Sequence, residues 1–252
     1  MMTKAVDLNS DMGESDREIA RDYCILNHVT SANIACGFHA GDPYTMLRVA
    51  QKCSQLNVGI GAHPSFLDRA NFGRTRVEMK KEELVPLIIY QIGALEGICR
   101  SIGRKVFHVK PHGALYNMAA DEDEYAEAVV KAARIMDKSI LTLPSSKLME
   151  KAINEGVKAF AEGFADRGYL SDGRLAPRGM ASSLITEPDV AAERALRLVD
   201  GSGIKSVDGL TINVQVQSIC IHSDTPNACK IAETVRRRLE EAGVRVVSLS
   251  EM

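Results

Sequence analysis

The sequence predicts an α/β protein of the closed (β/α) barrel class, formed as one domain over residues 1–252. Two observations lead to this fold: short apolar segments alternate with helical segments along the whole chain, and polar side chains follow most of the apolar segments. Alternation of this kind gives either a closed barrel or an open doubly wound sheet. Polar groups from six strand ends can meet at one place only if the sheet closes, so the barrel is favoured.

The apolar segments are short and apolar throughout, as in strands that helices cover on both sides of a parallel sheet. We expect strands at residues 5–8, 31–35, 58–62, 106–109, 140–143, 157–161, 217–221 and 244–249.

Helices are expected between these strands, because apolar residues recur there at a spacing of three or four. The segments are 43–56, 82–102, 123–136 and 227–242, the first of which is preceded by Asp42 as a suitable N-cap. Two connections, 63–81 and 162–188, are much longer than usual. Both leave the carboxyl rim of the predicted barrel, so we expect them to act as lids or to bind substrate.

Composition restricts the class of function. The 31 Lys and Arg residues nearly balance the 33 Asp and Glu residues, so neither nucleic acid nor an acidic membrane surface is indicated and a small-molecule substrate is expected. No apolar stretch approaches the roughly 20 residues that cross a bilayer, and the start lacks the apolar core of a signal peptide, so we expect a cytoplasmic protein. Six cysteines without a C-x-x-C pair are expected to be reduced thiols: Cys24, Cys36, Cys53, Cys99, Cys220 and Cys229.

The segment "DLNSDMGES" at 7–15 places three carboxylates and an amide near the end of the first strand: Asp7, Asn9, Asp11 and Glu14. Carboxylates this close repel each other unless a cation, a shared proton or an arginine relieves them. The segment therefore indicates a divalent-metal site or a general base. The alternative is that Asp11 or Ser15 caps a short helix that follows.

Four of the six histidines closely follow predicted strands: His39, His63, His112 and His222. A shared position of this kind indicates function rather than packing. Neutral imidazoles with a carboxylate suit zinc or iron, whereas acid/base catalysis needs a pKa near neutrality, and the sequence leaves both open. His28 and His108 are expected to be structural.

Lys110 stands in "VKPHGALYN" (109–117), directly behind an apolar strand. At the mouth of a barrel its ammonium could bind phosphate or a substrate carboxylate, form a Schiff base, or pair with Asp7 or Asp11. Arg167 and Arg178 suit bidentate binding of a carboxylate or phosphate, with surface solvation as the alternative. No dinucleotide glycine motif, P-loop or G-x-S-x-G segment occurs, which argues against dehydrogenases, P-loop kinases and serine hydrolases.

Seven ordered motifs make nearly the whole chain resemble the LamB/YcsF family: "DLNSDMGE", "ACGFHAGDP", "GAHPSF", "FGR", "VKPHGALYN", "FADRGY" and "CIHSD". The family usually has tyrosine, proline, glycine and glycine where this chain has Phe66, Leu67, Asn71 and Ser223.

The resemblance implies a seven-stranded barrel related to glycoside hydrolases and polysaccharide deacetylases. It also implies a role as the A subunit of an ATP-dependent 5-oxoprolinase that acts with subunits B and C. The reaction would convert 5-oxo-L-proline, ATP and water to L-glutamate, ADP and phosphate. The carboxylates of residues 7–15, rather than the resemblance, lead us to expect Mg²⁺ or another divalent metal as a further cofactor. An unstrained lactam is a stable amide, so coupling to ATP would lower the barrier to its opening.

We expect the catalytic residues to be Asp7, Asn9, Asp11, Glu14, His39, His63, Lys110 and His112. In this hypothesis the carboxylates hold a metal or activate water, the histidines transfer protons, and Lys110 binds the phosphate or the substrate carboxylate. Substrate binding is expected from Asp42, Arg74, Asp166, Arg167, Arg178, His222 and Asp224. Two other functions stay open: a stand-alone metal-dependent deacetylase of N-acyl sugars, and a non-catalytic scaffold that binds a metabolite for partner enzymes.

Overall fold

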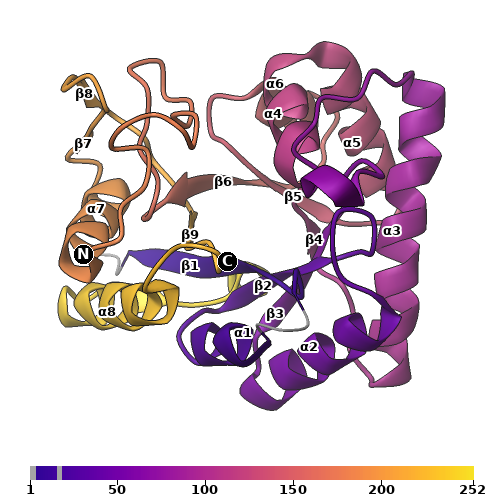
Figure 1. Cartoon of the computed structure of the whole chain (residues 1–252), viewed down its shortest axis with the longest axis horizontal. Coiled ribbons are helices and arrows are strands. Elements are labelled where there is room, and N and C mark those ends of the chain that lie inside the picture. The colour runs from indigo at the N-terminus through magenta and orange to yellow at the C-terminus, as the bar shows by residue number, and fades with distance from the viewer. Residues whose placement is uncertain (1–3, 16–18) are drawn as a thin grey trace.

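The computed structural model describes residues 4–15 and 19–252. Within them, seven parallel strands form a closed barrel that helices surround (Figure 1). The strands are β1 (Ala5–Met12), β2 (Ser31–Ala35), β3 (Gly59–His63), β4 (His108–Val109), β5 (Ser139–Thr142), β6 (Ala159–Phe164) and β9 (Ser218–Cys220). Each strand pairs with the next, and β9 pairs with both β6 and β1, which closes the ring. The closed seven-stranded barrel is thereby confirmed.

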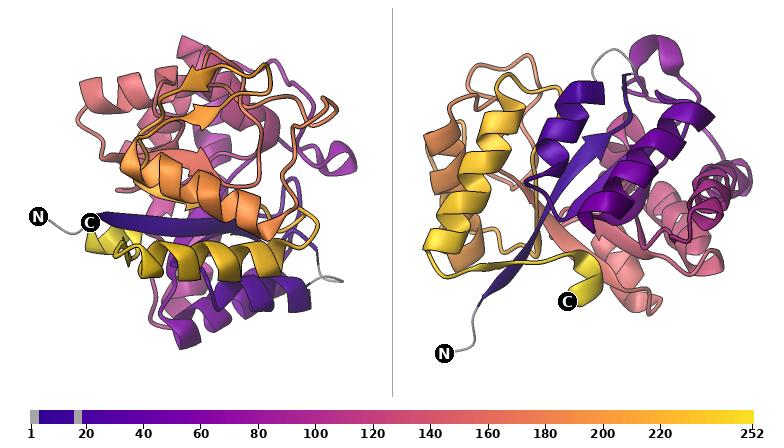
Figure 2. Two further views of the ribbon diagram at one scale, coloured as in Figure 1. Left: turned by 90° about the vertical axis from the view of Figure 1, so that its left-hand side faces the viewer. Right: turned by 90° about the horizontal axis from the view of Figure 1, so that it is seen from below.

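The eighth expected strand lies outside this ring. Only β10 (Arg245–Val246) forms in the segment 244–249, and it pairs with the first two residues of β1, beside the start of the barrel (Figure 2). An antiparallel hairpin of β7 (Ile204–Lys205) and β8 (Thr211–Ile212) was not expected. Its two-residue strands are too short to give a pattern in the sequence.

The helices are α1 (Ile19–Leu26), α2 (Pro43–Leu56), α3 (Lys81–Ser101), α4 (Gly113–Asp121), α5 (Asp123–Ile135), α6 (Lys147–Asn154), α7 (Pro188–Asp200) and α8 (Ala228–Glu241), with 3₁₀ turns η2 (Arg69–Asn71) and η3 (Leu249–Glu251). The four expected helices are confirmed, with every terminus within one residue of its expected position. The expectation of two long loops is also confirmed, because β3 and α3 are separated by residues 64–80 and β6 and α7 by residues 165–187. Asp11 lies inside β1 and therefore caps no helix, while residues 16–18, which precede α1, lie outside the described part.

Helix α3 is long and apolar enough, by length and composition, to cross a membrane. Such a segment was not expected from the sequence. In the structure α3 is one of the barrel's surrounding helices, and Leu84, Ile88, Ile92 and Leu95 are buried in the core. Its apolar residues therefore have a partner within the protein.

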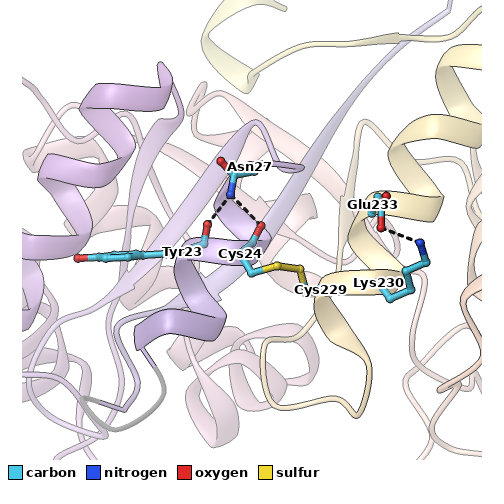
Figure 3. Close-up of a disulfide and its surroundings, with 6 residues drawn as sticks. All are labelled: Tyr23, Cys24, Asn27, Cys229, Lys230 and Glu233. Atoms are coloured by element: carbon cyan, nitrogen blue, oxygen red, sulfur yellow. Dashed lines mark hydrogen bonds and ion pairs between the residues drawn. A yellow bond between two sulfur atoms is a disulfide. The ribbon is translucent and has the colours of Figure 1, made fainter.

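A disulfide joins Cys24 in α1 to Cys229 in α8, across 205 residues of sequence (Figure 3). The expectation of six reduced thiols is wrong for this pair, whereas Cys36, Cys53, Cys99 and Cys220 are free and buried. The pair forms because the closure of the barrel places the first helix next to the last. Local sequence spacing contains no sign of this proximity.

The barrel interior is filled by polar as well as apolar side chains. His108 is fully buried, and its Nε2 lies 2.7 Å from Oδ1 of Asn33. A Cβ atom at Gly61 would lie 2.1 Å from Nε2 of His108. Glycine on β3 therefore makes room for the imidazole from β4, and His108 has the structural role expected from the sequence.

Replacing Gly61 with alanine should destabilise the protein by about 1–3 kcal/mol, because the new methyl group overlaps a buried ring. Urea unfolding followed by circular dichroism measures the change. Gly97→Ala is the matched control: a Cβ there meets nothing within 4 Å in helix α3, and alanine should stabilise the helix by about 0.5–1 kcal/mol. Equal effects of the two substitutions would contradict this account of the barrel interior.

Candidate functional site

A cavity of about 510 Å³ opens at the carboxyl ends of the barrel strands. Its wall includes Asp11 from β1 and His63 from β3, with Lys110 and His112 directly after β4. The two long loops complete the wall, through Arg74 from residues 64–80 and a run from Leu170 to Arg178 from residues 165–187. Four of the eight expected catalytic residues therefore face one cavity, at the rim where the sequence predicts the site.

Lys110 is a buried cation at the floor of this cavity, 3% exposed. Its Nζ lies 3.0 Å from Oδ1 of Asp11, 2.8 Å from Oε1 of Glu162 and 3.2 Å from Sγ of Cys220. Burial favours loss of the proton, but Asp11, Cys220 and Glu162 outweigh it and hold the pKa of Lys110 well above its usual range. The ammonium is therefore charged at neutral pH, which leaves no free amine for a Schiff base.

Glu162 was missing from the expected site. It is fully buried on β6, and its other oxygen accepts a hydrogen bond of 2.9 Å from the hydroxyl of Tyr116. The signal in the sequence was a charged residue inside the apolar segment "AFAEGF", which is rare unless the charge is paired. The expected pairing of Lys110 with Asp11 is present, and Glu162 is its second carboxylate partner.

Glu14 and three histidines form a compact cluster beside Lys110. Oε1 of Glu14 lies 3.1 Å from Nε2 of His39 and 3.3 Å from Nδ1 of His112, while Nε2 of His63 lies 2.9 Å from Nδ1 of His112. Burial lowers the pKa of His39 and of His112 well below the usual value. Burial and the Asp11 charge raise the pKa of Glu14 to about 7.

Asp11 connects the cluster to Lys110. Its Oδ2 lies 3.4 Å from Nε2 of His63, and its Oδ1 faces the ammonium. Burial alone would raise the pKa of Asp11, but His63 and Lys110 outweigh it and hold the pKa well below its usual value. Burial likewise acts against a charged His63, yet Asp11 raises the pKa of that imidazole.

The turn that positions His112 requires glycine at its end. Gly113 has a φ of +56°, and a Cβ there would lie 2.5 Å from the carbonyl oxygen of Gly73. The close approach lets Nε2 of His112 bond the carbonyl of Phe72 at 2.8 Å. The glycine of "VKPHG" thus joins the first long loop to the start of α4 and fixes the imidazole.

Asp7 lies away from the cavity. It is fully buried and accepts hydrogen bonds from the hydroxyls of Thr30, Ser31 and Ser218. Burial raises the pKa of Asp7 to about 6. Asn9 is next along the interior of β1, and its amide nitrogen donates to Ser218 at 2.7 Å. The structure therefore does not bring these two residues to the cavity wall with Asp11.

The expected substrate-binding residues separate into four groups. Asp224 bridges Arg74 and Arg178 at 2.9 and 3.1 Å, which joins the two long loops. Asp166 accepts hydrogen bonds from His222 and Thr225 and supports the β9 loop. Asp42 caps α2 through the backbone N–H groups of residues 44 and 45, and it is not part of the cavity wall.

Arg167 is the fourth group and lines the cavity, as Arg74, Arg178 and His222 do, with 7% of its surface exposed. Its guanidinium donates to two carbonyl oxygens of its own loop, from Nη2 to Ala176 at 2.6 Å and from Nε to Ser183 at 3.3 Å. No carboxylate of the described residues forms a salt bridge with it.

Residues 6–252 match the family model described as the LamB/YcsF family. The chain belongs to the LamB/YcsF family. It is 44% identical over 249 residues to a Streptomyces avermitilis protein that is named as the A subunit of 5-oxoprolinase, covering 97% of this chain and 100% of that protein. The crystal structure of a lactam utilization protein from Thermus thermophilus superposes with a TM-score of 0.91 at 41% identity, covering 97% of this chain and 100% of that one.

The barrel of this LamB/YcsF protein is also similar to that of the T48 deacetylase, with a TM-score of 0.51, 15% identity, and coverage of 99% and 90% of the two chains. This likeness concerns the fold alone. The deacetylase-like barrel fold that the motifs implied is thereby confirmed.

The four departures from the family pattern avoid the cavity wall. Phe66 is buried in the core, Leu67 is exposed, Asn71 hydrogen-bonds Asp68 in the η2 turn, and Ser223 is buried. None of the four side chains is therefore part of the cavity lining of this LamB/YcsF chain.

The raised pKa of Asp7 should make stability depend on pH. The folded state keeps the Asp7 proton up to about pH 6, whereas the unfolded chain loses it near 3.8. Stability from this group is therefore lost as pH rises between these values, by about 3 kcal/mol in full. Asp7→Asn has no such proton. The unfolding free energy of this variant, relative to that of the wild type, should therefore rise by most of that amount between pH 4 and pH 7.

Urea unfolding at a series of pH values measures this difference. Asp189→Asn is the control, because the Asp189 side chain is 84% exposed, and its curve should run parallel to that of the wild type. A parallel curve for Asp7→Asn as well would show that the pKa of Asp7 is not raised in the folded protein.

Proposed function

We propose that the chain is the A subunit of an ATP-dependent 5-oxoprolinase that acts in the cytoplasm with subunits B and C. Together they would convert 5-oxo-L-proline, ATP and water to L-glutamate, ADP and phosphate. Support comes from the family, from relatives that are named as the A subunit of 5-oxoprolinase, and from a cavity suited to an anionic lactam.

Arg167 is the observation that carries the choice of substrate. A guanidinium this buried, with no carboxylate partner among the described residues, is costly unless an anion binds to it. The cavity wall also includes Lys110, Arg74, Arg174 and Arg178. A substrate carboxylate, or a phosphoryl group added to the lactam oxygen, would find a positive wall here, whereas a neutral N-acyl sugar would gain little from it.

Opening the lactam develops negative charge on the carbonyl oxygen, and phosphorylation of that oxygen draws electrons from the carbon that water attacks. We propose that Lys110 stabilises this charge, because its ammonium is held rigidly and lies at the cavity floor. Asp11 would orient Lys110 and His63 rather than take up a proton, since its pKa is well below neutrality. The proton-transfer role of the histidines and the role of Asn9 stay predictions.

A stand-alone amide hydrolase or deacetylase is the second candidate. The specific observation in its favour is the Glu14 and histidine cluster, which suits hydrolysis of an N-acyl sugar as well. It predicts acetate release from N-acetylglucosamine oligomers by the purified chain alone. A non-catalytic scaffold would instead bind 5-oxoproline for partner enzymes. In that case substitutions at the rim would change the affinity for 5-oxoproline and not the rate of the reaction.

The experiment that tests the proposal is 5-oxoproline-dependent glutamate formation with ATP and Mg²⁺, by the chain alone and with subunits B and C. We expect activity only in the mixture, and Asp11→Ala should abolish it while the melting temperature shows that the variant is folded. Full activity of the chain without partners, or of the mixture with Asp11→Ala, would contradict the assignment.

Arg167→Ala should lower kcat/KM for 5-oxoproline by about 10²-fold, mainly through KM, because a charged contact to the substrate is lost. The control is Arg197→Ala, since that side chain is half exposed and paired with Glu193 on α7, and its kinetics should match the wild type. A fall in kcat with unchanged KM would show that Arg167 does not bind the ground-state substrate.

A further inference from the structure

Four side chains at the edge of the cavity place their donor atoms in one small volume. The ligand atoms of Glu14, His39, His63 and His112 all lie within 4.8 Å of one another. The histidines are almost fully buried, at 1, 1 and 7% exposure. They come from different parts of the barrel rim, so this arrangement is a property of the fold and not of a local turn.

Outer hydrogen bonds fix which nitrogen of each ring carries the proton. Nδ1 of His63 lies 2.7 Å from the carbonyl oxygen of Lys110, and Nε2 of His112 lies 2.8 Å from that of Phe72. A carbonyl oxygen only accepts, so each of these nitrogens must be a donor. The lone pairs of the neutral imidazoles are then Nε2 of His63 and Nδ1 of His112, both facing the cluster.

His39 is held in the same way by a hydroxyl group. The Ser65 hydroxyl donates to the carbonyl of Phe66 at 2.8 Å, which leaves its oxygen to accept from Nδ1 of His39 at 3.1 Å. Nε2 of His39 therefore also presents a lone pair to Glu14. Ligating histidines in metalloproteins are oriented by the same kind of outer hydrogen bond.

The cluster consequently holds three imidazole lone pairs and a carboxylate facing one another. Nε2 of His63 and Nδ1 of His112 are 2.9 Å apart, and Oε1 of Glu14 lies within 3.8 Å of all three rings. Acceptors this close repel each other unless a shared proton or a cation lies among them, and a single proton joins only two of the four ligand atoms. No lysine or arginine of the described residues forms a salt bridge with Glu14.

A second group with metal-ligand chemistry, Asp11, Cys220 and His222, differs on this point. Lys110 already places its ammonium 3.0 Å from Asp11 and 3.2 Å from Cys220. Its charge takes the place that a metal ion would fill, and it would repel one. Of these two groups, only the Glu14 cluster has metal-ligand atoms with no lysine or arginine beside them among the described residues.

We propose that Glu14, His39, His63 and His112 bind one divalent transition-metal ion, Zn²⁺ by preference. Three neutral imidazoles with one carboxylate match zinc, whereas Mg²⁺ prefers oxygen ligands only. Since His63 and His112 line the cavity, the ion lies at its wall, where a bound Zn²⁺ supplies a Lewis acid. The histidines are then ligands, not the proton carriers that the sequence led us to expect.

The test is metal binding by the whole chain, measured without substrate or partner subunits, so that its outcome is independent of the 5-oxoprolinase assay. Protein stripped with a chelator is titrated with ZnCl₂ by calorimetry, and with CoCl₂ to follow the visible absorption of coordinated Co²⁺. We expect one ion per chain and a Co²⁺ spectrum typical of tetrahedral or five-coordinate nitrogen and oxygen ligands.

His63→Ala and Glu14→Gln should each weaken Zn²⁺ binding by at least about 100-fold, because loss of a ligand exceeds the 10–100-fold effect of outer-shell changes. Ser65→Ala should weaken it by about tenfold through His39. His28→Ala, which changes a histidine remote from the cluster, should bind as the wild type does. Melting curves of the metal-free proteins show whether each variant is folded. If His63→Ala does not fold, Glu14→Gln alone tests the ligand assignment.

The proposal is overturned if the wild type takes up no stoichiometric Zn²⁺ or Co²⁺. It is equally overturned if folded Glu14→Gln binds Zn²⁺ with unchanged affinity.

Discussion

The buried charge of Lys110 is the constraint on which the rest of the site depends. An ammonium with 3% exposure is tolerated only because Asp11 and Glu162 neutralise it at 3.0 and 2.8 Å, and removing one partner of such a group typically costs about 3–5 kcal/mol. The three residues come from or directly follow β1, β4 and β6. The ion pairs therefore fix the relative positions of these strands at the rim. Asp11 also contacts His63, so the position of this imidazole depends on the same ion pairs.

Backbone carbonyls then determine the direction of the imidazoles. The carbonyl of Lys110 orients His63, and that of Phe72 orients His112. The second contact depends on the first long loop lying against the start of α4, which only glycine at position 113 permits. Lys110 and His112, on the same short segment after β4, thus connect the ammonium to the imidazole cluster. The metal ion and the anionic lactam that we propose would therefore bind at neighbouring places in one cavity.

Much of the site could be predicted from the sequence, because parallel strands bring their carboxyl ends to one rim and because the seven motifs are specific to a family. Asp11, Glu14 and the three histidines were predicted through their position at or after the ends of predicted strands. Glu162 was missed because it lies within a strand, and Asp7 was placed at the site although β1 turns its carboxylate towards Ser31 and Ser218. The Cys24–Cys229 pair depends on barrel closure, which no local pattern expresses.

The most direct test of the central claim, that this cavity receives an anionic lactam, is a crystal structure of the chain with 5-oxo-L-proline. We expect the substrate carboxylate to lie on the guanidinium of Arg167 and the lactam carbonyl to face Lys110 and His112. Ordered substrate elsewhere on the barrel, with this cavity holding only water, would contradict it.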